Sequence, residues 1–82
     1  MIAEKRNRLL SEMKSGETGL VVAVAGGKKA TKRLADLGLT PGTMVRVVRK
    51  TLFSGPMHIE VCGSKFAIGR GLAQKIIMDF NA

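Results

Sequence analysis

The sequence has few aromatic residues, few acidic residues and almost no cysteine. It contains three Phe, one Cys and neither Trp nor Tyr in 82 residues, and 14 Lys and Arg stand against 6 Asp and Glu. Recognition of single-stranded nucleic acid relies on stacking bases on aromatic rings, so the shortage of aromatics argues against it. One cysteine excludes an internal disulfide framework and fits a reducing compartment.

Long hydrophobic runs are also missing. No apolar run approaches the ~20 residues that span a bilayer, and the charged start of the chain is not followed by the apolar segment of a signal peptide. We therefore expect a cytoplasmic protein that does not itself span a membrane. The chain is short enough for one domain only, and its 45% hydrophobic residues suffice for an aliphatic core supplemented by methionine.

The net charge of +8 points to an anionic partner. Nucleic acid, an anionic membrane surface and an acidic protein face all meet that description. The basic residues are spread thinly along the chain, which argues against nucleic acid, and a charge that serves solubility alone is the competing interpretation. Self-association is left open.

The chain divides into a short extension and one domain. Residues 1–8 carry Lys and Arg without an apolar pattern, and we expect a flexible basic N-terminal extension there, followed by a domain over residues 9–82. Leu20–Ala25 is a continuous apolar run bounded by glycines, which predicts a buried strand. Gly26–Lys29 is expected to be a loop that leads into a helix.

A short helix follows this loop. Ala30, Leu34 and Leu37 recur at i, i+4 and i+7, so they share one helical face, which predicts that they pack on the core. Gly38 stands where a helix needs a left-handed residue after its end, and glycine adopts that conformation without a steric cost.

A tight turn and a strand come next. Thr40–Thr43 reads as a type II turn, in which Pro41 presets φ and Gly42 supplies the positive φ of the third position. Met44–Arg49 is rich in β-branched residues and predicts a strand. We therefore assign Gly38, Pro41 and Gly42 a structural role in the turn.

The C-terminal half predicts a hairpin and a last strand. Met57–Cys62 alternates, Gly63–Ser64 is the expected hairpin tip, and Lys65–Ile68 is the return strand. Gly69–Lys75 is expected to form one helical turn, and Ile76–Phe80 the closing strand. About five short strands with one short helix after the first predict a mainly β fold, a small closed or nearly closed barrel that leaves no exposed edges.

The chemistry-bearing side chains are few. His58, Glu60 and Cys62 would project from one face of a strand, and imidazole, carboxylate and thiolate together suit Fe²⁺ or Zn²⁺. Neighbours in this set would lie ~7 Å apart and the outer two ~13 Å apart, so convergence needs a bend or a second chain. Ordinary outward-facing strand residues are the favoured interpretation. No catalytic set is visible, and we expect no enzyme.

Three segments carry a family resemblance. These are Leu10–Gly19, Arg33–Thr43, which is the most specific, and Pro56–Val61 together with Phe66–Arg70. In all three the sequence resembles the FeoA family, small cytosolic proteins associated with the ferrous-iron transporter FeoB. The resemblance covers nearly the whole chain. One departure is Phe53–Pro56, where the family usually has an acidic turn residue.

The resemblance implies an SH3-like β-barrel. It also implies a non-enzymatic binding module that acts on the cytoplasmic part of a FeoB-type transporter and modulates Fe²⁺ transport. Two alternatives stay open: a metal-responsive SH3-like module that binds Fe²⁺ or Zn²⁺, and a small basic barrel that binds nucleic acid.

The helix is the expected partner surface. A barrel with a helix packed on it can bind a partner through the groove between them, and basic charge beside that groove would steer an acidic surface. The predicted contact residues are Lys28, Lys29, Lys32, Arg33, Leu34 and Leu39. For the two leucines, core packing is the competing interpretation.

Overall fold

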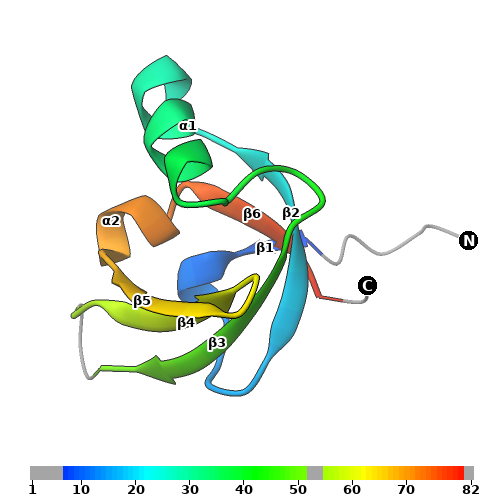
Figure 1. The fold of residues 1–82 in the computed structure, drawn as a ribbon, viewed down its shortest axis with the longest axis vertical. Coiled ribbons are helices and arrows are strands. Elements are labelled where there is room, and N and C mark those ends of the chain that lie inside the picture. Colours follow the sequence, from blue (N-terminus) through cyan, green and yellow to red (C-terminus); the bar gives the residue numbers. More distant parts are fainter. Residues whose placement is uncertain (1–6, 52–54, 81–82) are drawn as a thin grey trace, which may run out of the picture.

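The strands form one antiparallel sheet, hydrogen-bonded in the order β1-β6-β2-β3-β4-β5. The computed structural model of the protein describes residues 7–51 and 55–80. Figure 1 shows the sheet rolled around a core, with α1 standing at one end. The elements in chain order are β1 (Asn7–Leu9), the 3-10 helix η1 (Leu10–Glu12), β2 (Thr18–Val24), α1 (Gly27–Asp36), β3 (Met44–Lys50), β4 (Met57–Val61), β5 (Ser64–Ile68), α2 (Arg70–Ala73) and β6 (Ile76–Asp79).

The predicted mainly β fold is confirmed, but the described residues hold six strands, so α1 follows the second strand and not the first as predicted. The additional strand is β1, at the end of the segment expected to be a flexible extension. Asn7 and Arg8 pair with Asp79 and Met78 of β6. The Arg8 guanidinium also lies 4.2 Å from the centre of the Phe80 ring, a cation–π contact. The extension prediction is therefore wrong for Asn7 and Arg8, while residues 1–6 lie outside the described residues.

The helix begins earlier than the sequence predicts. Lys28 and Lys29, expected in a loop, form the first turn of α1, where the Thr31 hydroxyl donates a hydrogen bond of 2.8 Å to the Gly27 carbonyl. The glycine pair conceals this start, because glycine disfavours a helix interior and offers no side chain to cap one. As a consequence, both lysines are fixed on the helix surface.

The helix ends in a Schellman motif. Gly38 has φ +85°, its N–H donates to the Ala35 carbonyl at 2.9 Å, and the Leu39 N–H donates to the Leu34 carbonyl at 2.8 Å. These are the two hydrogen bonds that define the motif, and the hydrophobic contact that accompanies it joins residues in the positions of Leu34 and Leu39. Both leucines are buried, at 0% and 1% exposure.

The predicted turn after the helix is present and is tied to β2. Gly42 has φ +92°, and the Thr43 N–H donates to the Thr40 carbonyl at 3.0 Å. The Gly42 N–H donates to the Val21 carbonyl at 2.7 Å, and the Val21 N–H donates to the Thr43 carbonyl at 2.9 Å. The connection from α1 to β3 is therefore anchored on a neighbouring strand by backbone groups alone.

The hairpin tip lies one residue earlier than predicted. Val61 pairs with Ser64, and the two residues between them, Cys62 and Gly63, have φ +51° and +82°. Positive φ at both central residues is the type I′ turn that fits the twist of a two-residue hairpin. Cys62 is therefore a turn residue and does not continue the alternation of β4.

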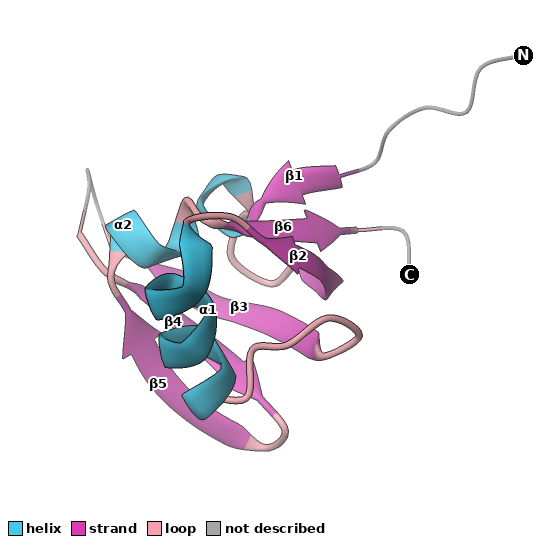
Figure 2. Cartoon of the chain, turned by 90° about the horizontal axis from the view of Figure 1, so that it is seen from above, coloured by secondary structure: helices cyan, strands magenta, loops and turns pink. Residues whose placement is uncertain are grey.

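The core lies inside the rolled sheet and under α1. Its buried members are Leu10, Met13, Val21, Leu34, Leu39, Val45, Val47, Met57, Ile59, Val61, Ile68, Ala73, Ile76 and Met78. Figure 2 shows α1 lying across the end of the roll, with β1, β6 and β2 to one side. None of the described helices is long and apolar enough to cross a membrane.

The positive φ at Gly42 gives a stability test. No heavy atom lies within 4 Å of a Cβ placed there, so only backbone strain opposes Gly42→Ala. We expect this variant to lose about 1–2 kcal/mol in the free energy of unfolding, measured by urea denaturation. The matched control is Gly71→Ala in α2, where a Cβ also meets nothing and φ is not positive, and where we expect no loss. Equal losses in both variants would contradict the strain argument.

Candidate functional site

The exposed side of α1 is basic. Its members, which we call the α1 cationic face, are Lys28, Lys29, Lys32 and Arg33, all exposed. Ala30 and Leu34 are buried and hold the opposite side of the helix on the core. The helix thus presents its cations on a fixed scaffold at one end of the molecule (Figure 1).

The α1 cationic face carries uncompensated charge. Ion pairs among residues 7–51 and 55–80 join Arg8 to Glu17 at 4.0 Å and Arg46 to Glu60 at 3.3 Å, and neither involves α1. Asp36 is the single acidic residue of the helix. Cations gathered on one element without carboxylate partners raise the local positive potential, which attracts anionic surfaces.

The predicted leucines do not lie on this face. Leu34 and Leu39 are buried at 0% and 1% exposure, so they stabilise the helix end and are not available to a partner. Leu37, which the helical pattern placed in the core, is 41% exposed. The reason is the Schellman motif, because Leu37 is the C-cap residue with φ −92° and no longer follows the helical face.

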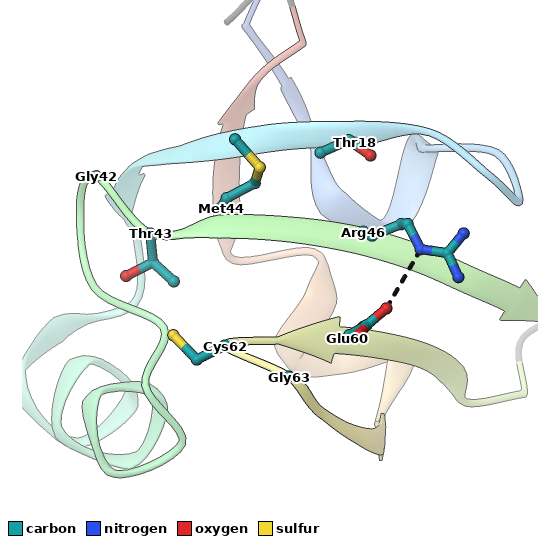
Figure 3. A pocket seen from close by; sticks show the side chains of 8 residues that line it. All are labelled: Thr18, Gly42, Thr43, Met44, Arg46, Glu60, Cys62 and Gly63. Carbon is teal, nitrogen blue, oxygen red and sulfur yellow. Dashed lines mark hydrogen bonds and ion pairs between the residues drawn. The ribbon is translucent and has the colours of Figure 1, made fainter.

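One side of the sheet carries a shallow groove of about 540 Å³, which we call the Met44 groove. Met44, which is 57% exposed, lies in this groove. The Arg46–Glu60 ion pair lies toward one end of the groove, and the Cys62 thiol lies toward the other end, near Thr43 (Figure 3). The groove is lined by Thr18, Gly42, Thr43, Met44, Arg46, Glu60, Cys62 and Gly63. The thioether and the thiol suit contact with an apolar group, whereas the Arg46–Glu60 ion pair at the other end favours a polar one.

The candidate metal-ligand set of His58, Glu60 and Cys62, over which ordinary strand residues were the favoured interpretation, is not assembled in the described residues. No group of three or more His, Cys, Asp and Glu side chains close enough to hold an ion occurs in the described residues. Glu60 is engaged with Arg46 at 3.3 Å, and Cys62 has left the strand for the turn. On a straight strand these side chains would not converge either, and the hairpin tip at Cys62 additionally takes the thiol out of β4.

A second groove, of about 370 Å³, separates α1 from the end of β5, and we call it the β5 groove. It matches the expectation of a groove between helix and barrel. Its lining residues are Arg33 and Asp36 from α1, the C-cap residue Leu37, and Ala67, Ile68, Gly69 and Leu72 opposite them. Of the predicted contact residues, only Arg33 reaches it.

A family model and a curated relative indicate the same family. The profile of the FeoA domain matches residues 8–79. A curated protein of Methanocaldococcus jannaschii, provisionally named Fe(2+) transport protein A, is 39% identical over 70 residues, which cover 85% of this chain and 83% of that protein.

Solved structures of FeoA proteins share the fold of this chain. A crystal structure described as the iron uptake regulatory protein FeoA is 41% identical, with a TM-score of 0.84 over 89% of this chain and 96% of that one. FeoA of Stenotrophomonas maltophilia, solved in complex with zinc and described as an SH3 domain protein, is 26% identical, with a TM-score of 0.75 over 88% and 89% of the two chains. The predicted SH3-like fold is thereby confirmed.

Because His58, Glu60 and Cys62 do not converge, we predict that these three residues do not form a Zn²⁺ site in the isolated chain. We expect calorimetric titration with Zn²⁺ to give the same isotherm for the unaltered chain and for His58→Ala, because the three side chains do not converge. Tight binding of one ion that disappears in His58→Ala would contradict this geometry. Cys62→Ser serves as the second variant, since a site that includes the thiol would lose affinity in both.

Proposed function

This chain belongs to the FeoA family, and on that premise we propose that it is a cytoplasmic accessory protein of ferrous-iron uptake. It binds the cytoplasmic part of a FeoB-type transporter, modulates Fe²⁺ transport and carries out no reaction of its own. The α1 cationic face is its contact surface. The observation that carries this assignment is the absence of ion pairs from that face among the described residues.

The charge of α1 supports an acidic partner surface. Opposite charges steer two proteins together before contact, and exposed cations contribute more to the rate of association than to the final affinity. The side chains are presented by a helix whose end is fixed by hydrogen bonds of 2.8 and 2.9 Å, so little backbone ordering is required on binding.

Modulation follows from differential binding. A partner changes the balance between two states of a transporter only if it binds one of them more tightly than the other. A rigid basic surface binds one state of the transporter more tightly when the complementary acidic surface is formed or exposed in that state only. The chain then acts by contact and needs neither a catalytic group nor a bound cofactor.

A retention experiment tests the partnership. The purified chain is passed over the detergent-solubilised, full-length FeoB-type transporter encoded by the same genome, at physiological salt and with excess competing DNA. We expect saturable retention on the transporter. Retention on DNA in place of the transporter would overturn the proposal and assign the basic charge to nucleic acid, and retention on neither would overturn it as well.

The role of the α1 cationic face is tested by kinetics. Changing Lys28, Lys29, Lys32 and Arg33 to Gln together should lower the association rate with the transporter by about tenfold at low salt and flatten its dependence on salt. The dissociation rate should change less. Surface plasmon resonance at several salt concentrations measures all three quantities.

A matched pair of double variants separates location from net charge. Lys28→Gln with Lys32→Gln removes two charges from α1, and Lys14→Gln with Arg49→Gln removes two exposed charges from elsewhere. We expect the first pair to slow association clearly more than the second. Equal effects would show that total charge, and not the α1 cationic face, governs association.

A further inference from the structure

Strand β5 is an edge of the sheet, so the prediction of a barrel without exposed edges is wrong at this strand. It pairs with β4 alone, and the strand order ends with it. The type I′ turn makes Val61 and Ser64 a hydrogen-bonded pair, and such pairs alternate along an antiparallel hairpin. The Ile59–Phe66 pair is therefore hydrogen-bonded too, whereas the backbone groups of Lys65 and Ala67 point away from β4.

These outward backbone groups have no partner in the described part of the chain. Every hydrogen bond that the structure gives β5 lies in its ladder with β4, and none reaches the N–H or C=O of Lys65 or Ala67 from another element. Two N–H and two C=O groups along an edge form a ready template for one more strand. Proteins bind extended peptides in this way, by strand addition.

The β5 groove lies beside this edge. Ala67 and Ile68 form its strand side, and α1 and α2 lie beyond β5 in Figure 1. Its apolar side chains opposite the strand are Leu37, the C-cap residue of α1, which is 41% exposed, and the half-buried Leu72 of α2. Main-chain hydrogen bonds and a place for an apolar side chain therefore occur together, which is the combination that strand addition uses.

We propose that β5 binds an extended segment of a partner protein in which acidic and apolar residues alternate. The segment pairs with the free N–H and C=O groups of Lys65 and Ala67. Its apolar side chains enter the β5 groove against Leu37 and Leu72, and a carboxylate lies opposite Lys65 as a cross-strand pair.

Charge selects this occupant over a second copy of the chain. Lys65 is an exposed cation on the edge strand itself. Arg33, which lines the groove, has no ion-pair partner in the described residues. The groove contains one acidic residue, Asp36. Two copies with a net charge of +8 repel each other, and a lysine on an edge strand opposes pairing with its own kind. The inference holds for any protein that carries such a segment, so it does not depend on the proposed transporter partnership.

Peptide probes test the proposal on the full chain. The probe is a nine-residue peptide of alternating Glu and Leu or Val with both ends blocked, and the matched probe replaces each Glu by Lys. In ¹⁵N-labelled protein, we expect the acidic probe to shift the amide signals of Lys65 and Ala67 and to slow their hydrogen exchange. We expect the lysine probe to do neither.

Two variants separate the backbone from the groove. Ala67→Pro removes an N–H that makes no hydrogen bond in the free protein, and proline is tolerated on edge strands, so the fold should persist while probe affinity falls about fivefold or more. Ala67→Ser keeps the N–H and serves as its control. Leu37→Asp should weaken the probe, whereas Val22→Asp, at the same 41% exposure on β2, should not.

The remaining outcomes overturn the proposal. No shift at Lys65 and Ala67 with the acidic probe at millimolar concentration would show that the edge is not a binding strand. Equal binding of the lysine probe would remove the role of charge. Slowed exchange at Lys65 and Ala67 that depends on protein concentration without any probe would identify a second copy as the occupant.

Discussion

The backbone hydrogen bonds that end α1 determine the rest of the arrangement. Within residues 34–43 the chain closes a Schellman motif and a type II turn, and the turn is joined to Val21 on β2 in both directions. Two glycines with positive φ, Gly38 and Gly42, make this possible. Because backbone groups make all of these contacts, the helix is fixed relative to the sheet before any surface side chain is considered.

Both candidate surfaces follow from this fixed helix. With Leu34 and Leu39 held in the core at 0% and 1% exposure, the cations Lys28 to Arg33 have only the outer side of α1 to occupy. The same placement brings the C-terminal end of α1 beside β5 without covering it, so a groove of about 370 Å³ is left between them. The basic side of the helix and the groove beside β5 both depend on this placement of α1, whereas the open edge itself results from the strand order, in which β5 pairs with β4 alone.

Local patterns predicted the helix end, the turn and most strands, because Gly38, Pro41 and Gly42 and the β-branched residues act over short distances. Features that depend on distant segments were not predictable in this way. Asn7–Leu9 becomes a strand because β6 pairs with it, and its sequence shows no strand pattern. Cys62 adopts positive φ, which is uncommon for a residue other than glycine, and so the hairpin tip lies at Cys62–Gly63 and not at Gly63–Ser64 as predicted. The Cys62 thiol therefore does not lie on β4 with His58 and Glu60. The exposure of Leu37 and the presence of the β5 groove depend on where α1 packs on the sheet, and the hydrophobic periodicity of the sequence does not predict that position.

The most direct test of the α1 cationic face is lysine footprinting in the complex with the full-length FeoB-type transporter. Acetylation of each lysine is measured by mass spectrometry, with and without a saturating amount of transporter. Lys28, Lys29 and Lys32 should become protected, while Lys14, which is also exposed and lies between η1 and β2, should be labelled as before. Unchanged labelling of the three α1 lysines in a demonstrated complex would contradict the account and place the contact on another face.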